Sequence, residues 1–224
     1  MEKKYKLTDE TIIVDGRTLH RIEALKDFAN IKKGEKGGFI ENEENLSQSG
    51  DCWVCDNARV YGNAKVFGNA RIFGDVFVLN NAQIYGNAQI CGYAVVSDYA
   101  QVCDNAEVCD NAEIRGNASV SDYAVVGDHA QVYGNAEISD NARIYGYTTV
   151  FEDAMVYGNA EVFDNAEVYG KARVYGNVEV YDSARVYGNA KVCDDAYIYN
   201  NAKICGNAKV YGNMEIYGNT KFGE

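Results

Sequence analysis

The strongest pattern in the chain is an aliphatic residue at every sixth position from Val54 to Phe222. Each of these positions holds Val or Ile except the last, and a small residue, nearly always Ala, follows four residues later. In Ala58-Arg59-Val60-Tyr61 the side chains alternate between apolar and polar or aromatic, the period of two that a strand with one buried face shows. We therefore expect Ala and Val to point inward and Arg and Tyr outward. Between residues 58 and 220 the small position is not Ala at Val76, Thr148, Val178, Met214 and Thr220.

The two residues between successive strands are of types that form tight turns. Gly62-Asn63 is typical, and Gly and Asn accept the positive φ that a sharp corner requires. A helix is excluded because its apolar spacing is near 3.6 and Gly every six residues would break it. A short strand cannot bury its inner face alone, so the repeat must stack on itself. Three six-residue sides form an 18-residue triangular coil, and about ten coils stacked roughly 4.8 Å apart form a prism.

This pattern, aliphatic-x-x-x-small-x, resembles the hexapeptide repeat of the left-handed parallel β-helix, the trimeric acyltransferase-like superfamily. The resemblance implies an all-β, single-stranded, left-handed parallel β-helix; spacing alone does not give the handedness. Three runs near the N-terminus also resemble a group of uninterrupted bacterial and prophage hexapeptide proteins that are labelled transferases without an established activity. These runs are Gly37-Gly38-Phe39-Ile40-Glu41, Glu44-Asn45-Leu46-Ser47 and Cys52-Trp53-Val54.

Residues 1–50 do not follow the repeat and are predicted to form an N-terminal cap on a β-helix of residues 51–224. Two β-rich runs around Asp15-Gly16, within residues 11–22, predict a hairpin. Residues 23–29 have apolar spacing that predicts a short helical turn, and residues 31–38 read as a loop without the order of a phosphate-binding motif. The hairpin with Phe28, Phe39, Ile40 and Leu46 is expected to cover the open end of the prism.

The composition of the chain excludes several classes of protein. The chain has 33 acidic and 21 basic residues, a net charge of −12, and no Pro. No run is apolar enough for a membrane span, and the N-terminus lacks a secretory signal, so we expect a cytoplasmic protein. The acidic balance disfavours direct nucleic-acid binding. The seven cysteines are odd in number and lack metal-like spacing, which favours free thiols; Cys91 and Cys109, one coil apart, are poorly placed for a disulfide.

The outward positions predict aromatic ladders and a waist between them. Grouping by eighteen aligns Tyr145, Phe163, Tyr181, Tyr199 and Tyr217 in one ladder and Tyr133, Phe151, Tyr169 and Tyr187 in another. Such stacks stabilise a sheet, and an aromatic face also suits contact with another subunit. Between residues 91 and 127 the same position holds Cys, Ser or Gly, except at Arg115, with rings at the corners instead, which suits either a shallow groove or surface variation. The residues that would line a ligand site there are Tyr93, Tyr99, Arg115, Tyr123, His129 and Tyr147.

Evidence for an enzyme is sparse. The resembled acyltransferases use a catalytic His with loops that project from the prism, whereas this repeat is uninterrupted and the chain has only His20 and His129. The γ-class carbonic anhydrases share the coil but need three histidine ligands to zinc. We therefore predict a non-catalytic rigid scaffold or binding module, encoded by a phage or prophage, without metal or cofactor. The alternatives are an acyltransferase-like enzyme with a subunit-interface site near His129, and an acidic rod that imitates DNA or sequesters a small nucleotide-like ligand.

Self-association is the expected partnership, with a protein or small-molecule ligand as a further partner. The repeat continues to Phe222, where Phe replaces Val or Ile and is expected to plug the core. Uncovered strand edges invite association. Two modes are predicted: a side-by-side trimer through the aromatic faces, or an end-to-end dimer through the last coil.

Overall fold

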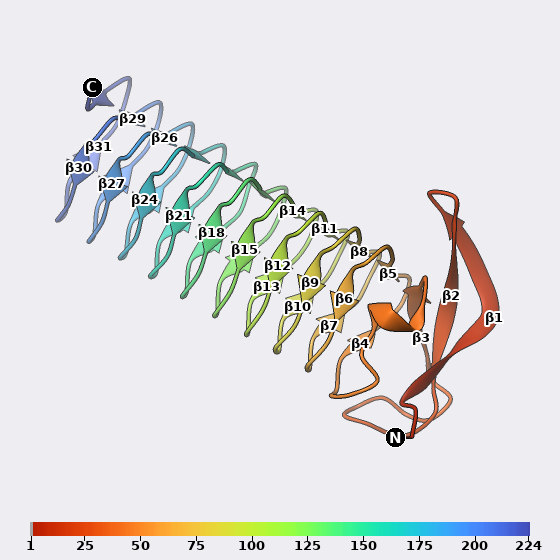
Figure 1. Cartoon of the computed structure of the whole chain (residues 1–224). Helices are drawn as coiled ribbons and strands as arrows, with labels where there is room; N and C mark the ends of the chain where they lie inside the picture. Colours follow the sequence, from red (N-terminus) through yellow and green to blue (C-terminus); the bar gives the residue numbers. More distant parts are fainter. Residues whose placement is uncertain (1) are drawn as a thin grey trace.

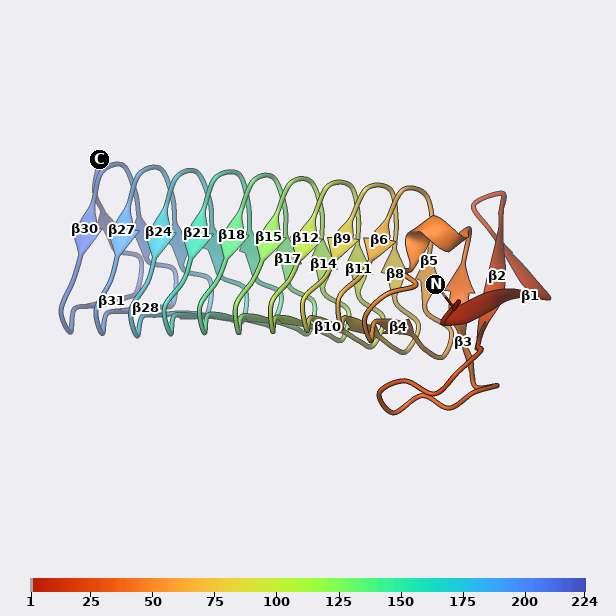
Figure 2. The ribbon, with the colours of Figure 1, turned by 60° about the horizontal axis from the view of Figure 1, so that its bottom comes forward.

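The computed structural model describes residues 2–224 and shows a rod of stacked coils with a β-hairpin at one end (Figures 1 and 2). Each coil contributes one two-residue strand to each of three sheets, which have 13, 10 and 9 strands. Pairing between successive coils is parallel throughout; Gln89 and Ile90, for example, pair with Glu107 and Val108, one coil further on. The prediction of an all-β, single-stranded parallel β-helix of about ten coils is confirmed.

The strands are assigned to the sheets as follows. The 13-stranded sheet contains β1 (Tyr5–Val14), β2 (Arg17–Ala24), β3 (Lys36–Ile40), β5 (Arg59–Val60), β8 (Phe77–Val78), β11 (Val95–Val96), β14 (Glu113–Ile114), β17 (Gln131–Val132), β20 (Thr149–Val150), β23 (Glu167–Val168), β26 (Arg185–Val186), β29 (Lys203–Ile204) and β32 (Lys221–Phe222). The 10-stranded sheet contains β4 (Trp53–Val54), β7 (Arg71–Ile72), β10 (Gln89–Ile90), β13 (Glu107–Val108), β16 (Val125–Val126), β19 (Arg143–Ile144), β22 (Glu161–Val162), β25 (Glu179–Val180), β28 (Tyr197–Ile198) and β31 (Glu215–Ile216). The 9-stranded sheet contains β6 (Lys65–Val66), β9 (Gln83–Ile84), β12 (Gln101–Val102), β15 (Ser119–Val120), β18 (Glu137–Ile138), β21 (Met155–Val156), β24 (Arg173–Val174), β27 (Lys191–Val192) and β30 (Lys209–Val210).

The core is a column of aliphatic and small side chains. Val108 and Ala106 are fully buried, as are nearly all their equivalents from Val54 to Ile204, which confirms the inward direction of these positions. Only near the last coil does burial fail: Met214 is 40% and Phe222 36% exposed, so Phe222 does not plug the core as expected. Its ring lies in the last strand, and no further described coil covers it.

The small position tolerates different residues in each sheet. The position leading into the 9-stranded sheet is Ala in every coil from Ala64 to Ala208. The position leading into the 13-stranded sheet also accepts Val76 and Thr148, both fully buried. Thr148 is accommodated because its Oγ1 donates a hydrogen bond to Tyr145 O at 2.7 Å. The three corners of the triangle therefore differ in how much side-chain volume they admit.

The corners use left-handed backbone in nearly every coil. Gly146 has φ of 73°, and Asp122, at the equivalent position of a different corner, has φ of 59°. Where the residue is Asp, its carboxylate also bonds to the next coil: Asp122 Oδ2 accepts a hydrogen bond from Asp140 N at 3.2 Å. Asp is one of the few non-Gly residues that tolerates this conformation because its side chain bonds locally.

The hairpin prediction is confirmed, with longer strands than expected. β1 and β2 pair antiparallel around Asp15-Gly16, β2 pairs antiparallel with β3, and β3 pairs in parallel with β5. The hairpin thus extends the 13-stranded sheet and covers its first edge. Leu19 of the hairpin packs with Phe39 and Tyr61 in a hydrophobic cluster that is separate from the core of the prism. Phe39 therefore lies under the hairpin on the outside of the prism and not over its open end.

The predicted helical turn at residues 23–29 is wrong. Residue 24 still belongs to β2, and Phe28 instead pairs with Ile31 in an isolated bridge. Backbone hydrogen bonds explain the difference: Ala24 N donates to Glu35 O and Leu25 N donates to Lys4 O. Partners distant in sequence satisfy these groups, so no helical hydrogen bond forms. In residues 2–224 the one helical segment is a single 3-10 turn, η1 (Glu43–Asn45), whose Asn42 cap the sequence did not reveal.

The first coil begins before the sequence repeat becomes regular. Ile40 pairs with Val60, and Leu46 bridges to Val66, so both residues lie in the core column. Val54 follows Leu46 by eight positions instead of six, and the longer corner is held by a buried lysine. Lys4 Nζ donates to Cys52 O at 2.9 Å and to Gly50 O at 3.1 Å. Burial lowers the pKa of Lys4, an effect that the neighbouring Cys52 thiol partly opposes.

Candidate ligand cleft beside the N-terminal cap

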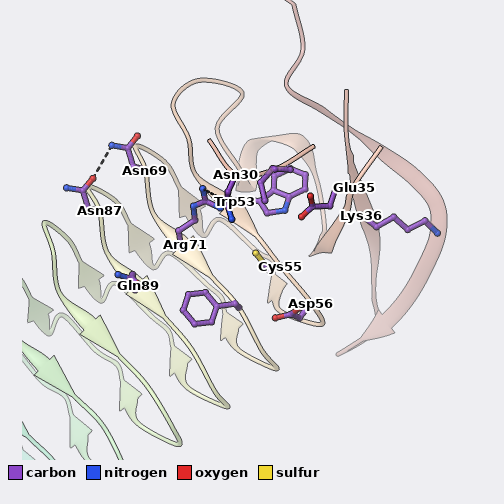
Figure 3. Close-up of a pocket in the computed structure, with 12 residues that line it drawn as sticks. Asn30, Glu35, Lys36, Trp53, Cys55, Asp56, Asn69, Arg71, Asn87 and Gln89 are labelled. Atoms are coloured by element: carbon purple, nitrogen blue, oxygen red, sulfur yellow. Dashed lines mark hydrogen bonds between the residues drawn. The ribbon is translucent and has the colours of Figure 1, made fainter. Parts of the chain in front are cut away.

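A cleft of about 600 Å³ lies between the cap loop of residues 25–36 and the outer face of the 10-stranded sheet (Figure 3). It exists because the cap overhangs the first coils of the prism. Its lining combines amides, one guanidinium, a thiol and aromatic rings. The lining residues are Asn30, Ile31, Glu35, Lys36, Trp53, Cys55, Asp56, Asn69, Arg71, Phe73, Asn87 and Gln89.

The cap end of the cleft is apolar and rigid. Trp53 occupies an outward strand position yet is fully buried, because Phe28 packs edge-on against its ring at 5.3 Å. Tyr5 packs on the indole in a similar way at 6.2 Å. Cys55 lies beside it, and burial raises the pKa of its thiol to about 11. The Cys55 side chain is therefore a neutral wall and not a nucleophile at neutral pH.

Arg71 is the central cation of the cleft. It is half-buried, and its Nη2 donates to Asn30 Oδ1 at 2.7 Å, which ties the cap loop to β7. Within residues 2–224 no carboxylate lies within salt-bridge distance of this guanidinium. An arginine carries five N–H donors in a planar fork that suits carboxylate and phosphate. Gln89 is its partner in the ladder and adds an amide one coil further on.

The other charged groups that line the cleft have partners elsewhere. Asp56 Oδ2 accepts from Gly74 N at 2.9 Å, and Glu35 Oε2 accepts from Lys32 N at 3.0 Å. Lys36 Nζ binds Glu10 Oε2 at 2.8 Å, and its side chain extends away from the cleft in Figure 3. Arg71 is therefore the cation whose remaining donors are available to a ligand.

The structure separates most of the residues predicted to line the waist. Tyr93, Tyr99 and Tyr123 are each more than 60% exposed and occupy three different corners of the triangle. Tyr93 follows β10, Tyr99 follows β11 and Tyr123 follows β15. These three rings diverge around the prism and do not line one groove. Tyr99 instead lines a smaller recess of about 340 Å³ beside the cap.

His129 and Tyr147 are the two predicted residues that meet. Their rings stack at 4.7 Å with an interplanar angle of 3° on the same edge that carries Tyr93. Arg115 lies on a different surface, the outer face of the 13-stranded sheet, where its guanidinium covers the Tyr133 ring at 4.8 Å. The arrangement at His129 is an exposed aromatic stack.

His20 and the seven cysteines are the other side chains that could serve as a base or a nucleophile. His20 lies in the hairpin, with Nδ1 3.1 Å from Thr8 O. All seven thiols are free. Burial, assisted by the Asp110 carboxylate, raises the pKa of Cys109 to about 12. In the described part of the chain no three His, Cys, Asp or Glu side chains come together as a metal site, and no helix is long and apolar enough to cross a membrane.

Both predicted aromatic ladders are confirmed. Tyr181 stacks on Phe163 at 5.0 Å with an interplanar angle of 3°, and the ladder continues to Tyr199 and Tyr217. Successive rings lie face to face, so their edges point to solvent. These outer faces are therefore stiffened by stacking and offer few free ring faces to a ligand.

Two comparisons bear on the family. The model of the YdcK β-solenoid repeat matches residues 82–98 and 172–188, and each match covers one coil through all three sheets. The chain is a hexapeptide-repeat parallel β-helix protein. It is also 36% identical over 69 residues to a protein named uncharacterized acetyltransferase YdcK from Escherichia coli (strain K12), an alignment that covers 27% of this chain and 21% of that protein. The alignment thus spans about a fifth of the relative.

Sequence reasoning missed Arg71, Asn30 and Gln89 as neighbours in a cleft. The sequence contained one indication that a segment packs here: Trp53 stands at an outward strand position, where its large apolar ring would otherwise be exposed to solvent. Residues of the cap bury this ring, but the cap loop has no sequence repeat from which its position could be predicted. The location of the cleft therefore required the tertiary structure.

Proposed function

We propose that this protein is a non-catalytic binding module that holds a small organic anion in the cleft beside its N-terminal cap. The observation that carries the proposal is Arg71, a half-buried guanidinium fixed by Asn30 and not neutralised by a carboxylate of the described residues. A carboxylate or phosphate would pair with its free N–H groups, and Gln89 would supply an amide. The Trp53 and Cys55 wall would cover an apolar part of the ligand.

The rigidity of the site supports binding over catalysis. Arg71 lies in β7, which is hydrogen-bonded to β4 and β10, so its backbone is held on both sides. The thiol in the cleft is neutral because its pKa is raised, and neither histidine lines the cleft. A group that accepts and returns a proton near neutral pH is what general acid–base catalysis needs. The lining offers recognition groups instead.

Thermal-shift screening with small carboxylates and phosphates tests the proposal, with isothermal titration on the hits. Ligand binding raises the melting temperature by mass action, and Arg71→Gln should abolish this shift. Arg143→Gln is the matched control, because Arg143 occupies the same outward position of the 10-stranded sheet, away from the cleft. If hits bind both variants and the unmodified protein equally, the cleft is not the site.

An acyltransferase activity is the second candidate, and the name of the Escherichia coli relative, an uncharacterized acetyltransferase, favours it. Its catalytic residue would be His129 on the edge that carries the Tyr147 stack. Incubation with acetyl-CoA and an amine or hydroxyl acceptor panel tests this function by release of free CoA. Turnover that disappears in His129→Ala would replace the binding proposal by the enzymatic one, while Arg71→Gln serves as the control.

A further inference from the structure

The last three coils separate their charges by face. Seven basic residues from residue 171 onward lie on the 13-stranded sheet, on the 9-stranded sheet or at the corner between them. They are Lys171, Arg173, Arg185, Lys191, Lys203, Lys209 and Lys221. The acidic residues of the same segment, apart from Glu224, lie in the 10-stranded sheet or at its two corners. They are Glu179, Asp182, Asp194, Asp195 and Glu215. In a chain of net charge −12, this creates a local basic surface.

One part of this surface is concave. A groove of about 460 Å³ runs along the outer face of the 13-stranded sheet over β26, β29 and β32. Each of the three coils contributes the same two positions, a polar corner residue and a cation at the start of the strand. The three pairs are Ser183 with Arg185, Asn201 with Lys203, and Asn219 with Lys221.

The polar groups of the groove have no side-chain partner, unlike most asparagines at the other two corners of the triangle. In other corners the asparagine amides bond to one another from coil to coil, as Asn69 does to Asn87 at 3.0 Å. The side chains of Asn201 and Asn219 have no such partner among residues 2–224. Their amides therefore remain available to a ligand.

The positive charges of the groove have few ion-pair partners. Arg185 pairs with Glu167 at 3.1 Å, but Lys203 and Lys221 have no carboxylate within 4.0 Å in the described chain. Arg185, Lys203 and Lys221 are direct neighbours in the parallel ladder. Like charges directly opposite one another on a sheet are destabilising. A ligand with a row of negative charges would remove this repulsion.

We propose that this groove binds an extended acidic polysaccharide with one carboxylate on each sugar. Its cations repeat at the coil spacing of roughly 4.8 Å, close to the length of one extended uronic acid residue. Each sugar would thus place its carboxylate on one cation and its hydroxyls on the Ser or Asn of the same coil. Three coils accommodate three consecutive sugars. This surface lies at the opposite end of the prism from the Arg71 cleft and does not depend on it (Figure 1).

The aromatic residues beside the groove disfavour single-stranded nucleic acid as the ligand. Proteins that bind such strands stack the bases on exposed aromatic faces. Tyr187 follows Arg185 in the same coil, and the face of its ring toward the preceding coil is covered by the Tyr169 ring. The two ring centroids are 5.0 Å apart and the interplanar angle is 4°. The groove floor therefore presents amides and cations, which match hydroxyls and carboxylates rather than bases.

Binding of galacturonic acid oligosaccharides, measured by isothermal titration, tests the proposal with the full chain. The methyl-esterified oligosaccharide, which keeps the backbone but loses the charges, should bind at least tenfold more weakly. We expect Lys203→Gln to weaken binding about fivefold and Lys203→Gln with Lys221→Gln about twentyfold, the range for exposed charge pairs. The double variant Lys191→Gln with Lys209→Gln, on the 9-stranded face of the same coils, should bind like the unmodified protein.

Three results would overturn the proposal. Equal binding of the esterified oligosaccharide would remove the role of the carboxylates, and equal losses in both double variants would remove the role of the groove. Tighter binding of a single-stranded oligonucleotide of equal charge would assign the surface to phosphate polyanions. Circular dichroism of each variant checks that the β-helix is intact, and Arg71→Gln should leave polysaccharide binding unchanged whatever its effect on the cleft.

Discussion

Replacement of Ala142 by Leu tests how tightly the interior of the prism is packed. Ala142 is fully buried, and the coils on either side place Ala124 and Ala160 at the equivalent position. Leu adds three carbon atoms to a space whose depth is one coil, roughly 4.8 Å, so the new atoms meet these neighbours at once. Overpacking typically costs about 1 to 3 kcal/mol. We expect about 3 kcal/mol or more here, because the coils above and below repeat the constraint.

The expected cost is measurable by thermal unfolding. For a protein of this size each kcal/mol lowers the melting temperature by about 2 to 4 °C, so Ala142→Leu should lower it by about 6 to 12 °C. Ala142→Val is the control, because Val178 fills the same position two coils further on and is fully buried. It should lower the melting temperature by only a few degrees. A calorimetric midpoint for Ala142→Leu that matches the unmodified protein would refute the reasoning.

Three further predictions concern protonation, corners and assembly. Burial raises the pKa of the Cys55 and Cys103 thiols from 9.0 to about 11. The unfolded state therefore loses these protons at lower pH than the folded state, and the free energy of unfolding should fall as pH rises from 9 to 11. Urea midpoints at several pH values measure this fall, which should be smaller in the double variant Cys55→Ser with Cys103→Ser. Gly146→Ala should destabilise by more than Gly212→Ala, since both positions have positive φ but only at Gly146 would a Cβ meet backbone atoms, at 2.6 Å; similar urea midpoints would contradict this. The 224-residue chain should self-associate as a trimer or an end-to-end dimer, and light scattering that shows only monomer at high concentration would exclude both.

The regular part of the fold was determined by local sequence. An aliphatic residue every six positions and a turn-forming pair in between leave one way to bury the inner face, so the coil, its 18-residue register and both aromatic ladders could be predicted. Each of these features depends on contacts between residues one coil apart, such as Tyr181 with Phe163. A periodic sequence specifies such contacts directly, because equivalent residues recur every 18 positions and each coil packs on the next in the same way.

The cap and the cleft were decided by tertiary structure. The helical spacing of residues 23–29 was overridden because Ala24 and Leu25 find backbone partners in Glu35 and Lys4, which are distant in sequence. The same long-range contacts bring Asn30 to Arg71 and create the cleft. The residues predicted at the waist are separated for the converse reason, since Tyr93, Tyr99 and Tyr123 are close in sequence but occupy three corners. A residue's place around the triangle follows from its register, whereas the path of an irregular segment over that triangle follows only from packing.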